Sequence, residues 1–285
     1  MRGRRYDDGF GWRVTQRNPA GLGRLTVARV GPRSVVTAAF ASSPLRLLTP
    51  ANHGHAAWVY SSSYGGGLLD GDVLSMHTTV GPRACAFVST QASTKVYKSP
   101  RGTRVEMTAD VADDGLLVLA PDPVVCFAGS TYRQFLQFDL SSRAGLVAVD
   151  WVSSGRRESG ERWAFDEYHS GTVVRFGGRL AMHDALALRA SDGDLATRLG
   201  RYDVLAVAVV MGVALSGDVE RIMTQVNSDP PTGGQEQLVT ASAIGASGCV
   251  VRVAGRSVEA VGYTLQTFLD FVPARLGDSP WARKW

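Results

Sequence analysis

The segment YGGGLLDGDVLSMHTTVGPRACAFVSTQASTKVYKS, residues 64–99, is the stretch on which the expected fold rests. It contains two strand-like runs, Val73–Val80 and Ala84–Thr90, which are joined by the turn Gly81-Pro82-Arg83. Three consecutive glycines precede the first run, and glycine readily adopts positive φ and lets the backbone approach another surface closely. The polar run after Thr90 keeps β-propensity while it offers hydroxyl groups and an ammonium group. The segment therefore predicts a glycine turn followed by a pair of strands whose end is suited to polar contacts.

Strand signals continue on both sides of this segment, with turns at intervals of roughly ten residues. Residues 25–30 and 34–41 predict one hairpin, and residues 172–177 and 179–189 predict another around Gly177-Gly178. Further strand-like runs lie at residues 45–49, 56–64, 103–112, 116–120, 132–140, 146–152 and 204–215. This spacing is typical of a mostly β domain.

Two helices interrupt the β pattern in the C-terminal third. Residues 215–227 carry apolar side chains at helical spacing, with Ser216 as the candidate N-cap. Ser257 is the candidate cap of a longer helix, whose apolar stripe we expect Pro273 to end.

Composition and charge limit the classes of protein. The chain has 285 residues, of which 32 are glycine and 20% are charged, and this favours a turn-rich globular protein. The net charge is +4, and the basic residues are spread along the sequence. A nucleic-acid-binding protein normally concentrates its Lys and Arg in one stripe, so no nucleic-acid partner is expected. We expect residues 1–20 to form a mobile tail and residues 21–285 to form a single domain.

Features of membrane and exported proteins are not evident in the sequence. The longest apolar run, Val204–Leu215, is too short to span a bilayer, and no apolar signal segment follows the basic N-terminus. The three cysteines, Cys85, Cys126 and Cys249, lie far apart and fit a reducing cytoplasm. A cytoplasmic protein without a membrane contact is therefore expected.

The glycine turn does not match a nucleotide-binding loop. No Gly-Lys-Ser/Thr follows Gly65-Gly66-Gly67, and the dinucleotide pattern fails at its last glycine. Taken alone, the turn is best interpreted as a hairpin turn, and residues 90–99 as an ordinary polar strand.

Carboxylates and histidines provide the remaining candidates for chemistry. Asp150 and Glu161 either form structural ion pairs with nearby arginines or line a water-filled passage for a divalent ion. His53 and His55 are a weak candidate metal pair, because stable sites normally use three or four ligands. No catalytic motif is present, so the sequence predicts a protein that is not an enzyme.

Three blocks resemble the urease accessory protein UreD (UreH) family. They are YGGG…GD at residues 64–72, TQASTKVY at residues 90–97 and DW…SGR…GER at residues 150–162, in matching order. The resemblance implies many short strands stacked in a helical, solenoid-like arrangement, with two helices attached.

The resemblance also implies a function and its partners. Proteins of this family help to insert nickel into apo-urease together with UreF and the GTPase UreG, in a complex that can be dimeric. It implies Ni²⁺ in transit rather than a tightly bound cofactor. A plain scaffold without metal conduction, or an unrecognised β-rich hydrolase, is the alternative.

Site residues follow from the matched blocks. Those expected to line a transit path for the metal are Asp70, Asp72, Asp150 and Glu161. Those expected to have structural or partner-contact roles are Tyr64, Gly65, Gly66, Gly67, Gln91, Ser93, Thr94, Lys95, Tyr97, Arg156 and Arg162. Carboxylates and water suit a path from which Ni²⁺ must leave, because a closed His/Cys site would retain the ion.

Overall fold

The chain passes repeatedly between two sheets that pack face to face. The computed structural model describes residues 21–228 and 235–283, so the tail expected at residues 1–20 lies outside the described residues. The middle of one sheet consists of β4 (Ala57–Ser63), β6 (Cys85–Thr90), β9 (Leu116–Leu119) and β12 (Gly145–Ser153). The middle of the other consists of β5 (Val73–Val80), β8 (Thr103–Val111), β11 (Thr131–Leu140) and β13 (Glu167–Phe176). Neighbouring strands within each of these sets are parallel, which confirms the solenoid-like, mostly β fold.

Antiparallel strands complete both sheets. The seven-stranded sheet has the order β14-β13-β11-β8-β5-β1-β2. β1 (Gly21–Val30) and β2 (Arg33–Ala41) form one of the expected hairpins, and β13 and β14 (Arg179–Arg189) form the other. The ten-stranded sheet has the order β16-β17-β15-β12-β9-β6-β4-β3, and off this path β10 pairs with β12 and β7 pairs with β10. Its remaining strands are β3 (Leu45–Leu48), β7 (Thr94–Val96), β10 (Val124–Cys126), β15 (Val204–Met211), β16 (Gln237–Ile244) and β17 (Gly248–Gly255).

The two runs of the opening segment do not pair with each other. β5 belongs to the seven-stranded sheet and β6 to the ten-stranded sheet, so the expected strand pair is wrong. The turn between them carries the chain across the sandwich, and Gly81 N–H donates to Val27 O at 2.8 Å. Residues 85–89 are all buried, because the seven-stranded sheet covers one face of β6 and the C-terminal helices cover the other.

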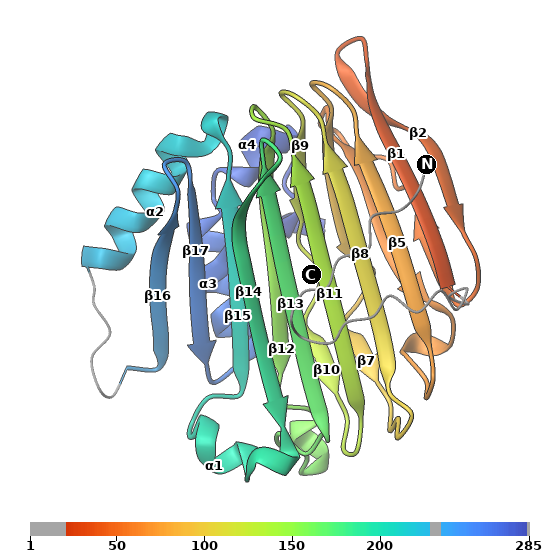
Figure 1. The fold of residues 1–285 in the computed structure, drawn as a ribbon, viewed down its shortest axis with the longest axis vertical. Coiled ribbons are helices and arrows are strands. Elements are labelled where there is room, and N and C mark those ends of the chain that lie inside the picture. The colour runs from red at the N-terminus through yellow and green to blue at the C-terminus, as the bar shows by residue number, and fades with distance from the viewer. Residues whose placement is uncertain (1–20, 229–234, 284–285) are drawn as a thin grey trace.

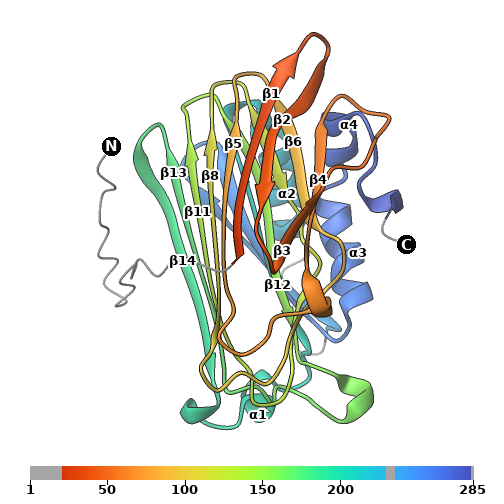
Figure 2. The same cartoon turned by 90° about the vertical axis from the view of Figure 1, so that its right-hand side faces the viewer.

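Three of the four described α-helices lie on the outer face of the ten-stranded sheet, and none of the described helices lies on the outer face of the seven-stranded sheet (Figures 1 and 2). α2 (Ser216–Ser228) buries Val219, Ile222 and Val226, as the apolar spacing predicts. Ser216 is already helical rather than a cap.

The second expected helix is divided. α3 (Val258–Phe268) starts where Ser257 Oγ accepts the Ala260 N–H at 3.1 Å, so this cap is confirmed. Pro273 does not end the helical region but lies at the start of α4 (Val272–Leu276), a position where its missing N–H has no cost. One more short helix, α1 (Leu195–Leu199), joins the two sheets, and no described helix could cross a membrane.

Apolar side chains form two main layers. One fills the space between the sheets, and the other joins the ten-stranded sheet to the helices. β12 contributes to both, because Leu146 and Ala148 face the first layer while Val147, Val149 and Trp151 face the second. The alternation places Asp150 on the face directed at the seven-stranded sheet, and its carboxylate is the starting point for the site.

Candidate functional site

The two sequence blocks at the ends of residues 64–99 meet in space. Leu68 N–H donates to Lys95 O at 2.8 Å, and Tyr97 N–H donates to Leu68 O at 3.0 Å. These bonds make a parallel bridge between Leu68 and Val96. Gly67 fits beside it only because it has no side chain, since a Cβ there would lie 2.6 Å from Lys95 O and 2.7 Å from the Tyr97 ring. The glycine block and the TKVY block are therefore one structural unit.

We expect Gly67→Ala to lower the free energy of unfolding by about 1–3 kcal/mol, because the new methyl group would push the bridge apart. Gly217→Ala is the matched control, since a Cβ at Gly217 in α2 meets nothing within 4 Å. The control should be neutral or raise the stability by up to about 1 kcal/mol. Urea unfolding of both variants measures the difference, and equal stabilities would contradict the close approach at Gly67.

The first glycines of the block form an exposed turn. Gly65 and Gly66 have φ of 81° and 73°, which favours glycine at both positions. Tyr64 is exposed, and the Arg46 guanidinium lies 5.0 Å from the centre of its ring. Tyr64 and Arg46 therefore place an aromatic ring and a cation side by side at the surface.

Asp70 and Asp72 have local partners in the turn that follows. Asp70 accepts from the backbone N–H and from Nε of Arg101, both at 2.8 Å. The hydrogen bonds from Arg101 hold the pKa of Asp70 below its usual value. Asp72 accepts the Leu69 N–H at 2.7 Å. Both carboxylates stabilise the turn.

Glu161 forms an ion pair with Arg156 and also accepts the Ala128 N–H at 3.2 Å. The Arg156 hydrogen bond lowers the pKa of Glu161. The same guanidinium lies 4.2 Å from the centre of the Phe127 ring, which contacts Tyr97 edge to face. This cluster fastens the loop after β12 to the TKVY block.

Arg162 has a different partner. Its Nε donates to Asp203 at 2.5 Å, and its other nitrogens donate to carbonyls that include Ala196 O and Tyr202 O at 3.3 Å. Asp203 also pairs with Arg157 and is buried. Arg162 thus joins the loop after β12 to the residues around α1.

A cavity of about 300 Å³ lies between the sheets. Its walls are mainly apolar and include Met76 and Met107 on adjacent strands of the seven-stranded sheet. Its rim is polar and carries Ser61–Ser63 beside Gln91, Ser93 and Thr94. Gln91 is exposed, whereas Ser93 and Thr94 are half-buried, so the predicted TQAST residues form the mouth. Lys95 is exposed just beyond it.

Asp150 lies at the inner end of this cavity. Its carboxylate accepts from Ser170 Oγ at 2.5 Å, from Gln134 Nε2 at 2.9 Å and from Tyr168 OH at 3.4 Å. All three donors are uncharged and come from the opposite sheet. Burial raises the pKa of Asp150 although these hydrogen bonds oppose the shift, because no positive charge compensates the lost hydration.

Aromatic hydroxyls extend the same cluster. Tyr132 OH donates to Gln134 Oε1 at 2.8 Å, and the Tyr132 ring stacks on Tyr168 at 5.8 Å between centroids. Burial raises the pKa of both phenols well above the usual value, so both stay neutral. We call Asp150, Gln134, Ser170, Tyr132 and Tyr168 the Asp150 cluster.

A second, much smaller cavity touches the other side of Asp150. Its volume is about 20 Å³, which is room for about one water, and Ser170 and Asp184 are among its lining residues. Asp184 pairs with Arg252 of β17 at 2.5 Å, across the gap between the sheets. Asp150 therefore separates a wide cavity from a narrow one that ends near an ion pair.

The candidate histidines lie elsewhere. His53 and His55 are in the loop before β4, where their backbone N–H groups bond to Asp278 and Leu276. Within the described residues, no group of three or more His, Cys, Asp or Glu side chains could hold a metal ion. All three cysteines are buried, and burial raises the pKa of Cys85 and of Cys126 to about 12.

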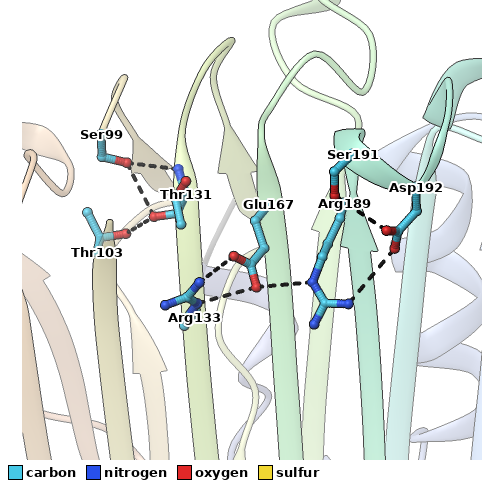
Figure 3. Close-up of polar contacts among 8 residues, drawn as sticks. All are labelled: Ser99, Thr103, Thr131, Arg133, Glu167, Arg189, Ser191 and Asp192. Carbon is cyan, nitrogen blue, oxygen red and sulfur yellow. Dashed lines mark hydrogen bonds and ion pairs between the residues drawn. The ribbon is translucent and has the colours of Figure 1, made fainter. Parts of the chain in front are cut away.

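A polar network crosses the outer face of the seven-stranded sheet (Figure 3). Glu167 accepts from Arg133 at 2.6 Å and lies 3.6 Å from Arg189, which reaches Asp192. Beside it, Ser99 Oγ accepts the Thr131 N–H at 3.0 Å. The network fixes the ends of β8, β11, β13 and β14, and the inner faces of β11 and β13 carry the groups that donate to Asp150.

Sequence reasoning missed the partners of Asp150. Gln134 lies on the same face of β11 as buried Tyr132 and Leu136, so the inward direction of its amide could be predicted from the alternation along the strand. Ser170 and Asp184 carried no such signal, because they come from distant segments that only the strand order brings together.

Comparisons with known proteins agree with the matched blocks. The family model of the UreD urease accessory protein matches residues 20–285. The chain is 49% identical over 266 residues to the urease accessory protein UreD of Sorangium cellulosum, which covers 93% of this chain and 85% of that protein. It is 42% identical to the protein of the same name from an Anaeromyxobacter species, over 93% of this chain and 89% of that protein. Urease accessory protein D of Arabidopsis thaliana is 32% identical, over 91% and 99%.

Proposed function

The chain belongs to the UreD family of urease accessory proteins and has a role in urease maturation, and we propose that it passes Ni²⁺ through the space between its sheets. In this proposal the ion reaches the chain from the GTPase UreG in a complex with UreF and leaves it for apo-urease. The observation that carries the proposal is the position of Asp150 between two cavities, with only neutral donors around it.

The wide cavity suits an ion that keeps its water shell. Its volume of about 300 Å³ has room for several waters beside a cation. Transfer of a bare divalent ion into an apolar space would be prohibitively costly, so the ion travels hydrated past the apolar walls. Besides Asp150, the carboxylates that line the cavity are those of Glu106, which pairs with Arg104, and Asp122, which bonds to Thr90, so the ion is held only loosely and moves on.

Asp150 supplies a carboxylate without an ion pair at the narrow point, whereas Asp184 beside it pairs with Arg252. A carboxylate with three neutral donors can exchange those hydrogen bonds for an ion and its waters without breaking an ion pair. A single carboxylate also binds Ni²⁺ more weakly than a set of His or Cys ligands. Beyond it, the cavity of about 20 Å³ requires the ion to shed waters or the Asp184–Arg252 pair to open.

The other predicted path carboxylates have arginine or turn partners. Asp70 and Glu161 each pair with an arginine, and Asp72 caps a turn. In this proposal Asp150, rather than any of these three carboxylates, contacts the ion. The relatives are named accessory proteins, which supports a role without catalysis.

Reconstitution of urease activation, with the chain present or left out, tests this role. Apo-urease, UreF, UreG, GTP and Ni²⁺ are mixed with and without the purified chain, and bound nickel and ammonia release from urea are measured. We expect activation only when the chain is present. Equal activation without it would contradict the proposal, and turnover of urea or of a test ester by the chain alone would favour a hydrolase.

A further inference from the structure

One region of the molecule has an unusual charge composition. Residues 21–69 contain no aspartate and no glutamate but contain four arginines. They form β1 to β4 and therefore include both strands that end the two sheets on that side, β2 and β3 (Figures 1 and 2). The sandwich thus has one edge that is cationic and lacks acidic residues.

The arginines of this edge have no carboxylate partner among the described residues. Arg29 donates to Gly31 O, and Arg33 donates to Gly54 O and Asn52 O. Arg24 is exposed, and Arg46 lies over the Tyr64 ring. Elsewhere in the described chain most arginines pair with Asp or Glu, so these four charges are available to an outside partner.

A groove of about 380 Å³ lies between β2 and β3, and we call it the β2–β3 groove. Its lining includes Ala39, Phe40, Leu45, Arg46, Leu47 and Tyr64. Phe40 is 54% exposed and Tyr64 is 55% exposed, although both are large aromatic side chains. Exposed aromatic residues beside an arginine are the residue types enriched in protein–protein interfaces.

We propose that the β2–β3 groove binds a segment of a partner protein in which an apolar side chain lies next to a carboxylate. The apolar side chain would pack between Phe40, Leu47 and Tyr64, and the carboxylate would pair with Arg46. The guanidinium can form a bidentate pair with a carboxylate while it stays against the Tyr64 ring.

Two observations define how the segment binds. β2 has a register shift opposite Thr26 and Val27, so a partner strand could not pair along its whole length. Side chains inserted in the groove, rather than an added strand, therefore provide the contact. A nucleic acid is disfavoured because its phosphates would find one guanidinium in the groove and leave the aromatic rings exposed.

Peptide binding tests the proposal without nickel or urease, so its outcome is independent of metal passage. The probe is a fluorescent nine-residue peptide of leucine and glutamate, compared with the same peptide carrying lysine for glutamate and with a thymidine oligonucleotide of equal charge. We expect the full chain to bind only the leucine–glutamate peptide. Arg46→Glu and Phe40→Ala should each weaken binding about tenfold.

Arg179→Glu is the matched control, since Arg179 is exposed at the far strand β14. It should leave the affinity unchanged, and circular dichroism should give the same spectrum for all three variants. Equal affinities for Arg46→Glu and the control would overturn the proposal. Tighter binding of the oligonucleotide would also overturn it, in favour of a nucleic-acid surface.

Discussion

Asp150→Asn is expected to slow the nickel loading of urease about tenfold, which corresponds to about 1.4 kcal/mol in the barrier. Asparagine has the size of aspartate and can keep hydrogen bonds to Ser170 and Gln134, whose groups both donate and accept. It removes only the negative charge at the narrow point between the two cavities. Nickel bound per urease, followed over time with the full accessory complex, measures the effect.

The same substitution is expected to stabilise the fold. The pKa of Asp150 is raised in the folded chain, so the folded state binds the proton more readily than the unfolded state does. Stability therefore falls as the pH rises from the unfolded pKa through the folded pKa, because the ionised carboxylate is less favourable in the folded chain than in the unfolded chain. Asp150→Asn should raise Tm at pH 7 by roughly 2–4 °C, the shift that about 1 kcal/mol produces in a chain of this size.

A pH series separates the charge from other effects. In the native chain, protonation of Asp150 should slow loading as the pH falls through its raised pKa. The Asp150→Asn chain should lack this component, so the ratio of the two rates should approach one at low pH. Glu161→Gln and Asp70→Asn are controls with surface ion pairs, and we expect them to load nickel at the native rate. Native loading by Asp150→Asn at neutral pH would contradict the passage and favour a plain scaffold.

Asp203→Ala is expected to lower the free energy of unfolding by about 3–5 kcal/mol. The Asp203 carboxylate is buried, accepts from Arg162 Nε at 2.5 Å and pairs with Arg157. Its loss would leave the largely covered Arg162 guanidinium without a counter-charge. The loop after β12 would then lose its attachment to the residues around α1.

Asp270→Ala is the control for this effect, because Asp270 pairs with Arg221 at the exposed surface. An exposed pair contributes only about 0–1 kcal/mol. Urea denaturation of both variants measures the two changes. A loss at Asp203 no larger than the loss at Asp270 would contradict the structural role of the buried pair.

Local patterns predicted the strands well, and the two hairpins follow directly from turn residues between alternating runs. The sheet to which a strand belongs could not be predicted for β5 and β6, because a parallel solenoid places consecutive strands in different sheets. The pairing of the glycine block with the TKVY block depends on the close approach at Gly67, which the run of glycines already permitted. Sequence therefore predicts which segments form strands more reliably than it predicts which segments pair with each other.

The candidate site was predictable only in part. Alternation along β12 places Asp150 on one face with Ala148, but it does not say whether that face points to the other sheet or to the helices. Glu161 was an equally good candidate in the sequence, yet in the structure it forms an ion pair with Arg156 near the surface. The difference arises from partners that are distant in the chain, such as Gln134 and Ser170, and no local pattern contains them.

The most direct measurement blocks the mouth of the cavity. Because Cys85, Cys126 and Cys249 are buried, a cysteine introduced by Gln91→Cys at the rim can be labelled selectively with a bulky disulfide-forming reagent. Ser242→Cys on β16, exposed and absent from the cavity lining, receives the same label as the control. Complex assembly is followed by light scattering, and nickel per urease is measured before labelling, after labelling and after removal of the label by a reductant.

We expect the label at residue 91 to stop nickel loading while the complex still assembles, and we expect the reductant to restore loading. The label at residue 242 should have no effect. Undiminished loading with residue 91 fully labelled would contradict passage of nickel between the sheets.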